Sequence, residues 1–228
     1  MTLSRQRIVV TGANGNLGRA VAERAVSLGA EVALLDRTFD AALQRSPGER
    51  MSCYEVDLLD AAATRACFER LGRTDALCNV AGGFAAGQPV HETDEAVFER
   101  MFDLNVRTLL NSVRAVVPGM LVNGRGKIIN VGAIAALKGQ ASMGAYCAAK
   151  AVVLRLTESL AAELRDHGIN VNCVLPSIID TPQNRAAMPQ ADPTTWVSPA
   201  DLASVICYLA SDAASALHGA AIPVTNRV

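Results

Sequence analysis

Residues 7–21 read RIVVTGANGNLGRAV, and this stretch decides the fold. An apolar run typical of a buried strand leads into glycines at positions 12, 15 and 18, and a helical pattern follows. Glycines at a strand-to-helix junction let the chain turn tightly and let a pyrophosphate approach the backbone, where the amino end of the helix attracts its charge. Glycines also stand where they merely end strands, so the trio needs support from other residues.

A carboxylate at the end of the next apolar run gives that support. Asp36 stands 24 residues after Gly12, about where an acid that accepts a hydrogen bond from a ribose 2′-hydroxyl belongs. No Gly-Lys-Ser/Thr sequence closes the loop, which argues against an ATP-type phosphate loop. Asp36 would repel a 2′-phosphate and favours NAD, whereas the guanidinium of Arg37 could pair with that phosphate and leaves NADP possible.

Short apolar runs alternate with amphipathic stretches along the whole chain. The runs that predict strands are 7–11, 31–35, 51–56, 76–79, 127–131, 170–175 and 221–224, and the stretches that predict helices lie near 17–28, 60–71, 95–122, 146–166 and 200–210. This alternation predicts an α/β fold with a doubly wound parallel sheet, a Rossmann fold, in which residues 1–228 form a single domain. The least regular stretch, 176–199, predicts a mobile loop over the binding site.

The composition argues against several classes of protein. The net charge of −1 offers no basic surplus for nucleic acid and no acidic tail for a charged partner. The apolar runs are shorter than the roughly 20 residues that span a bilayer, and the start lacks the apolar core of a signal peptide, so we expect a cytoplasmic protein without a membrane partner. Six cysteines without CxxC spacing predict reduced thiols, and three histidines without ligand spacing predict no metal site.

The chemistry is indicated by residues 132–150, GAIAALKGQASMGAYCAAK. Tyr146 and Lys150 stand four residues apart in a helical pattern, so their side chains share one face. A close ammonium lowers the pKa of a phenol by about 1–3 units, which would make Tyr146 a useful proton donor. The alternative without a catalytic role is a half-buried tyrosine beside a solvated lysine on an ordinary helix.

Taken together, these residues resemble the short-chain dehydrogenase/reductase family. TGANGNLG stands for the glycine loop of the family, Asp57-Leu58 for its adenine-contacting pair, NVAG at 79–82 for its Asn-Asn-Ala-Gly turn and PSIIDT at 176–181 for its segment beside the nicotinamide. Tyr146 and Lys150 match its Tyr-x-x-x-Lys motif, and Asn105 matches its catalytic asparagine. The resemblance implies that the following residues bind the cofactor: Gly12, Gly15, Asn16, Leu17, Gly18, Asp36, Arg37, Asp57, Leu58, Asn79, Ala81, Gly82, Tyr146, Lys150, Pro176, Ile179 and Thr181.

The sequence departs from the family pattern at the position of the catalytic serine. That serine normally lies thirteen residues before the tyrosine, where this chain has Ala133. Ser142 could approach the site, but we expect a loop residue. Alanine at this position is known in the dihydropteridine reductases, and segments 80–87, 132–146 and 175–192 resemble that branch. Asn105 is unlike it, so the chain combines loops of that kind with an ordinary family framework.

The resemblance implies an NAD(P)-dependent oxidoreductase that transfers a hydride between a nicotinamide and a small C=O or C=N substrate. Tyr146 would act as acid and base, Lys150 would hold the nicotinamide ribose, and Asn105 would hold a relay water behind the lysine; an exposed helix amide is the alternative for Asn105. Loss of one oxyanion donor typically costs about 10²–10³ in turnover, which favours an activated, conjugated acceptor over ordinary ketones. A weakly catalytic dinucleotide-binding or sensing protein remains the alternative. We also expect a homodimer or homotetramer, paired through helices 95–122 and 146–166.

Overall fold

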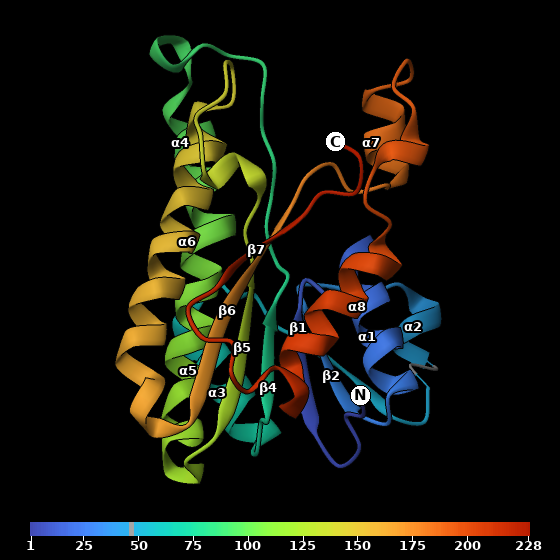
Figure 1. Ribbon diagram of the computed structural model, residues 1–228, viewed down its shortest axis with the longest axis vertical. Coiled ribbons are helices and arrows are strands. Elements are labelled where there is room, and N and C mark those ends of the chain that lie inside the picture. Colours follow the sequence, from blue (N-terminus) through green and yellow to red (C-terminus); the bar gives the residue numbers. More distant parts are fainter. Residues whose placement is uncertain (46–47) are drawn as a thin grey trace.

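Seven parallel strands form one sheet at the centre of the molecule in the computed structural model, which describes residues 1–45 and 48–228 (Figure 1). The strand order is β3-β2-β1-β4-β5-β6-β7. The strands are β1 (Arg7–Thr11), β2 (Glu31–Asp36), β3 (Met51–Glu55), β4 (Ala76–Asn79), β5 (Gly126–Val131), β6 (Ile169–Pro176) and β7 (Ala221–Val224). The order reverses between β1 and β4, and ligands of such sheets bind at the carboxyl ends of the strands beside that reversal.

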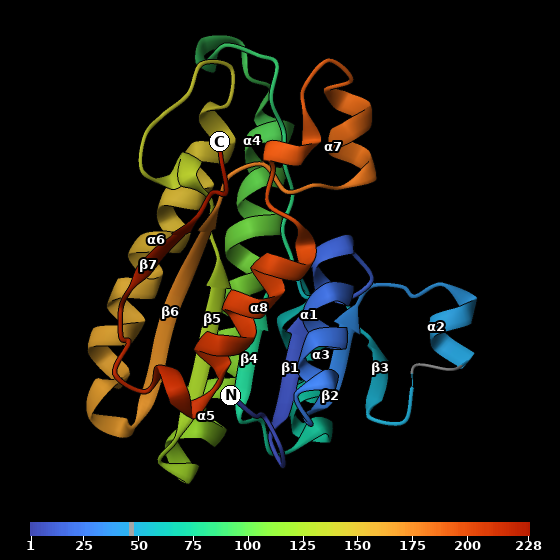
Figure 2. The same cartoon turned by 45° about the vertical axis from the view of Figure 1, so that its right-hand side comes forward.

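Helices cover both faces of the sheet (Figures 1 and 2). The helices are α1 (Asn16–Ser27), α2 (Ala41–Arg45), α3 (Ala61–Leu71), α4 (Glu95–Phe102), α5 (Thr108–Asn123), α6 (Gly144–Leu164), α7 (Pro182–Ala187) and α8 (Pro199–Ala210). One core lies between the sheet and helices α1 and α8, and a second lies between the sheet and helices α3, α5 and α6. The predicted doubly wound α/β fold is therefore confirmed.

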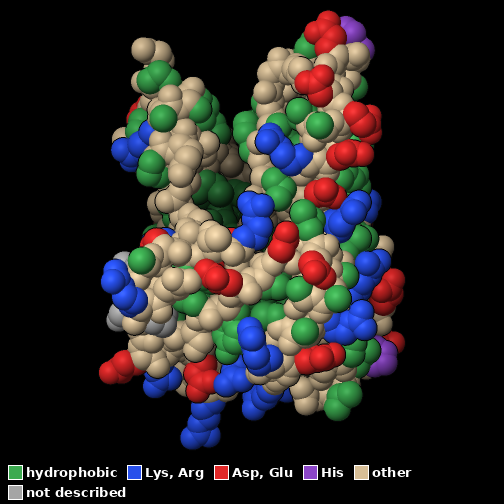
Figure 3. Space-filling model, turned by 180° about the vertical axis from the view of Figure 1, so that it is seen from behind, with side chains coloured by type: hydrophobic (Ala, Val, Ile, Leu, Met, Phe, Trp, Pro, Cys, Tyr) green, Lys and Arg blue, Asp and Glu red, His purple; other side chains and the backbone are tan. Residues whose placement is uncertain are grey.

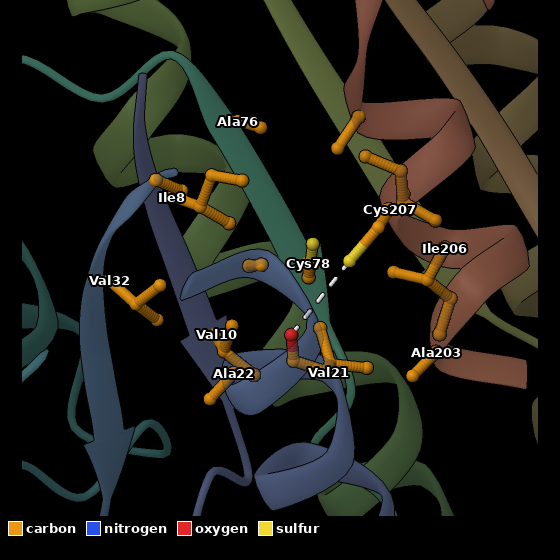
Figure 4. Close-up of a cluster of buried hydrophobic side chains, with 14 of the residues drawn as sticks. Ile8, Val10, Val21, Ala22, Val32, Ala76, Cys78, Ala203, Ile206 and Cys207 are labelled. Atoms are coloured by element: carbon orange, nitrogen blue, oxygen red, sulfur yellow. Dashed lines mark hydrogen bonds between the residues drawn. The ribbon is translucent and has the colours of Figure 1, made fainter. Parts of the chain in front are cut away.

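The side chains of each strand alternate between these two cores. Ile8 and Val10 of β1 pack under α1 and α8, whereas Val9 packs under α3 and α5. Figure 4 shows the first core at close range: Cys78 of β4 and Cys207 of α8 face each other beside Val21 of α1. All six cysteines are free thiols.

The predicted helix over 95–122 is interrupted by a wide turn. Residues Asp103–Arg107 form a π turn between α4 and α5, and the side-chain amide of Asn105 lies within it. In an α-helix the carbonyl of Met101 would accept from the backbone N–H of residue 105, but here it accepts from the Nδ2 of Asn105 at 2.9 Å. Two short helices were not predicted: α2, and α7 within the stretch expected to be a loop.

No helix of the described residues is both long and apolar enough to cross a membrane.

A chain of buried amides and hydroxyls ties the centre of the sheet to α6. Asn79 Nδ2 donates to Asn130 Oδ1 at 2.9 Å, Asn130 Nδ2 donates to Thr157 Oγ1 at 2.9 Å, and Thr157 Oγ1 donates to the carbonyl of Val153 at 2.8 Å. Asn130 is fully buried and bonds to both Asn79 and Thr157, so it is the central link of this chain.

We predict that Asn130→Leu lowers the free energy of unfolding by about 1–3 kcal/mol, because the buried Nδ2 of Asn79 loses its acceptor. The measurement is chemical denaturation at neutral pH with the slope against denaturant compared between the two proteins. Equal midpoints would show that the buried amide chain contributes nothing to stability.

Candidate active site

A cleft of about 1080 Å³ opens at the carboxyl ends of the strands. It is visible in Figure 3 as the hollow between the two projecting parts of the molecule, with hydrophobic side chains at its floor. Every predicted site residue except Asn79 and Asn105 lines it. These lining residues are Gly12, Gly15, Asn16, Leu17, Gly18, Asp36, Arg37, Asp57, Leu58, Ala81, Gly82, Tyr146, Lys150, Pro176, Ile179 and Thr181.

The glycine loop forms the wall of the cleft between β1 and α1. A Cβ on Gly18 would stand 2.2 Å from the carbonyl oxygen of Gly12, and one on Gly12, whose φ is +64°, would stand 2.7 Å from Cα of Ala81. Gly15 precedes the first turn of α1, and no side chain caps the backbone N–H groups there. These unpartnered donors at the positive end of a 12-residue helix fit a pyrophosphate.

Asp36 is joined to the glycine loop by a hydrogen bond. Its Oδ2 accepts from the backbone N–H of Asn14 at 2.9 Å and its Oδ1 accepts from that of Arg37 at 2.8 Å. A carboxylate has about four lone-pair positions, so two remain for ribose hydroxyls. Arg37 is exposed on the same rim of the cleft.

Tyr146 lies on the cleft wall beneath the ring of Phe84. The two rings meet edge to face, with 5.0 Å between their centroids, and Phe84 is 60% exposed. Burial raises the pKa of Tyr146 to about 12. The expectation that Lys150 lowers this pKa is therefore wrong for the protein as described, because desolvation of the phenolate outweighs any attraction to the ammonium.

Lys150 is held below the tyrosine. Its Nζ donates to the carbonyl of Val131 at 2.8 Å and lies 5.9 Å from the centroid of the Tyr146 ring. The side chain is 6% exposed, and burial lowers its pKa to about 8. The hydrogen bond to the end of β5 thus holds the lysine in place, and the lysine is not the solvated residue of the non-catalytic alternative.

Asn105 lies behind the cleft and binds the turn that follows β4. Its Oδ1 accepts from the backbone N–H of Gly83 at 3.2 Å, and its Nδ2 donates to the carbonyl of Gly83 at 3.0 Å. A Cβ on Gly82 would stand 2.8 Å from Asn105 Oδ1 and 3.5 Å from Lys150 Nζ. The amide therefore positions the turn beside the lysine, and it is not the exposed helix amide of the alternative.

The side chain of Asn79 is buried, and its amide donates to Asn130 on the neighbouring strand of the sheet. Thr11, which the sequence analysis missed, fixes the turn instead: its Oγ1 accepts from the backbone N–H groups of Val80 and Ala81, each at 3.1 Å. The sequence did contain a signal for this role, because Thr11 places a hydroxyl at the end of a buried strand, directly before the glycine loop.

The position of the missing serine faces the cleft. Ala133 lines it, whereas Ser142 is not among the lining residues; its carbonyl accepts from the backbone N–H of Gly87. Ser177 lines the cleft, but its hydroxyl donates to the carbonyl of Thr225 at 2.9 Å. Gln140 also lines the cleft and was not predicted.

The described part of the chain contains no cluster of three or more His, Cys, Asp or Glu side chains that could hold a metal ion.

Comparison with known proteins identifies the family. The family model described as short chain dehydrogenase matches residues 6–192. The chain belongs to the short-chain dehydrogenase family. It is 36% identical to a sorbitol dehydrogenase of Cereibacter sphaeroides, over 79% of this chain and 73% of the relative. A second relative, a 2-dehydro-3-deoxy-L-rhamnonate dehydrogenase (NAD(+)) of Sphingomonas, is 33% identical over 91% of this chain and 88% of its own.

A solved structure extends the likeness to almost the whole fold of this short-chain dehydrogenase. A Beutenbergia cavernae protein, provisionally assigned as an NAD(P)-dependent gluconate 5-dehydrogenase and holding NADP at low occupancy, matches with a TM-score of 0.90. The two are 27% identical, and the match covers 99% of this chain and 97% of the other. Relatives of this family member thus include one named for NAD and one holding NADP.

The buried lysine predicts how stability depends on pH. The pKa of Lys150 is 10.5 in free lysine and about 8 in the folded protein, so between these values the unfolded chain binds more protons than the folded one. The free energy of unfolding should therefore rise with pH across this window, by on the order of 3 kcal/mol in full.

The measurement is chemical denaturation of the wild type and Lys150→Met between about pH 7 and pH 9, below the range where Tyr146 titrates in the unfolded chain. The difference between the two proteins isolates the lysine from the thiols, whose raised pKa values act in the opposite direction. A difference that stays constant with pH would contradict a depressed pKa for Lys150.

Proposed function

We propose that this short-chain dehydrogenase is an NAD(P)-dependent oxidoreductase that uses Tyr146 as its acid and base and has no catalytic serine. The observation that carries the proposal is that Tyr146 and Lys150 line the same cleft as the glycine loop and Asp36. A reducing cofactor in that cleft and a proton donor at its wall are the two requirements of carbonyl or imine reduction.

The lining residues fit a dinucleotide from one end to the other. The N–H groups at the start of α1 would hold the pyrophosphate, Asp36 the adenosine ribose, Asp57-Leu58 the adenine, and Pro176–Thr181 together with Lys150 the nicotinamide half. When bound, the nicotinamide supplies or accepts the hydride. Tyr146 would donate its phenolic proton to the substrate heteroatom, because a pKa of about 12 keeps the phenol protonated at neutral pH.

Asp36 supports NAD as the preferred cofactor, because its carboxylate lines the cleft and would repel a 2′-phosphate on the adenosine ribose. We predict that NADH binds more tightly than NADPH. Asp36→Asn should narrow the difference, since it removes the charge while an amide oxygen can still accept from the N–H of Asn14. The measurement is fluorescence titration of both nucleotides, with Arg37→Ala as the matched variant. Tighter binding of NADPH that Arg37→Ala abolishes would make the arginine the determinant instead.

The substrate that fits this wall is an activated, conjugated acceptor such as a quinonoid dihydropterin. Ala133 offers no hydroxyl to a developing oxyanion, and a conjugated ring spreads that charge itself. Phe84, Met143 and Ile134 line the cleft around Tyr146 and provide an apolar surface for a flat ring.

Restoring the serine tests this substrate class. We predict that Ala133→Ser leaves turnover of an activated acceptor almost unchanged and raises turnover of simple ketones by about 10²–10³, the contribution of one oxyanion donor. Tyr146→Phe should lower both, and less so for the activated acceptor. NADH oxidation with quinonoid dihydropterin and a ketone panel is the measurement. Loss of activity in Ser142→Ala, with no effect of Ala133→Ser on any substrate, would mean that the hydroxyl is relocated.

A second candidate is a dinucleotide-binding or sensing protein with little chemistry. The raised pKa of Tyr146 and the apolar side chain at Ala133 favour it, because both weaken a reductase for ordinary carbonyls. In that case NADH would bind as tightly as it binds to a dehydrogenase, and Tyr146→Phe would not change the rate of NADH oxidation.

We further propose a homodimer or homotetramer paired through α4, α5 and α6. These helices keep apolar side chains partly exposed on their outer surfaces: Phe98, Leu110, Val152 and Leu156. Light scattering at micromolar concentration should give a multiple of the 23.9 kDa chain mass. A monomer mass would remove the proposal.

A further inference from the structure

A second cavity lies at the opposite end of the sheet from the active-site cleft. It has a volume of about 580 Å³ and is formed by the segments that lead into β1, β4, β5 and β6, together with residues after α8. The side chains that matter below are Gln6, Arg125, Lys127, Arg165 and His218. None of the residues that line this cavity also lines the cleft.

Buried polar atoms without a partner gather at this cavity. In the described residues, four such side-chain atoms occur, and three of them belong to residues of this cavity: Oε1 of Gln6 and both ring nitrogens of His218. Gln6 is 9% exposed. Because buried polar groups in proteins are normally hydrogen-bonded, a concentration of exceptions in one place points to a ligand that supplies the missing partners.

Three cations that form no ion pair in the described residues surround the same space. Arg125, Lys127 and Arg165 form no ion pair within the described ranges 1–45 and 48–228, and Lys127 is 9% exposed with its Nζ donating to Asn170 Oδ1 at 2.7 Å. A buried ammonium with only an amide as partner favours an anion beside it.

The two acidic residues of the cavity do not cancel this charge. Asp75 is 5% exposed, and its oxygens accept from the guanidinium of Arg73 and from the backbone N–H of Arg7. Asp212 is exposed, and although burial lowers the pKa of Lys127 overall, the charge of Asp212 acts to raise it; the two side chains form no ion pair in the described residues. The lining therefore keeps an excess of positive charge beside an acceptor, Gln6 Oε1, which needs a donor.

We propose that this cavity is a second binding site, for a small oxyanion that also carries hydroxyl groups, such as a hydroxylated carboxylate or a phosphate ester. The anionic group binds among Arg125, Lys127 and Arg165. Gln6 and His218, whose polar atoms are buried without a partner, turn them toward the hydroxyl groups when the ligand enters. The volume exceeds that of a lone phosphate, so a ligand of several carbon atoms fits.

Isothermal titration calorimetry with citrate and with glycerol 3-phosphate tests the site on the whole chain. We expect saturable binding of at least one probe, weakened tenfold or more by Lys127→Met and by the exposed variant Arg165→Met. Arg65→Met is the matched control, because Arg65 is an exposed cation on α3 outside the cavity. Gln6→Leu should weaken citrate more than it weakens inorganic phosphate, which needs fewer donor contacts.

Three results would overturn the proposal. One is the absence of saturable heat with both probes, and another is equal affinity in Arg65→Met and Arg165→Met, which would indicate an adventitious ion only. The third is competition between the probe and NADH, which would place the probe in the cleft. NADH binding that is unchanged at saturating probe supports two separate sites, and this readout does not depend on the activity proposed for the cleft.

Discussion

The backbone of the glycine loop lies directly against its own helix and against the turn after β4, and the rest of the site depends on this contact. A side chain on Gly18 would overlap the carbonyl of Gly12, and one on Gly12 would overlap Ala81. Close approach brings the amino end of α1 to the reversal in strand order, where β1 and β4 lie side by side. The cleft, its phosphate-binding donors and the position of Asp36 all follow from that approach.

The reactive end of the cleft is governed by burial more than by attraction between charges. Desolvation raises the pKa of Tyr146 and lowers that of Lys150, so each group favours its neutral form more than it would in water. A phenol that holds its proton is a weak acid, and Ala133 offers no hydroxyl to share the developing charge. Both features favour the proposed substrate, which stabilises its own charge.

The strands could be predicted from the sequence almost to the residue, because buried parallel strands are unbroken apolar runs bounded by turns. The chain between 95 and 122 could not, since its helical pattern is continuous and the π turn accompanies a bond from the side-chain amide of Asn105 to the carbonyl of Met101. The resemblance predicts Asn79 in the cofactor site, yet its amide bonds to Asn130 on the neighbouring strand β5. Pattern gives the element on which a residue lies, but tertiary partners decide where its side chain points.

We propose that this short-chain dehydrogenase transfers a hydride and does not merely bind a dinucleotide. The most direct measurement is a single-turnover reaction in which excess protein, loaded with NADH carrying deuterium at the transferred position, is mixed with a conjugated acceptor. The account predicts loss of the reduced nicotinamide absorbance, slowed by deuterium relative to unlabelled NADH, with a rate that falls in Tyr146→Phe. Bound NADH that stays reduced with every conjugated acceptor, ketone and imine offered would contradict it.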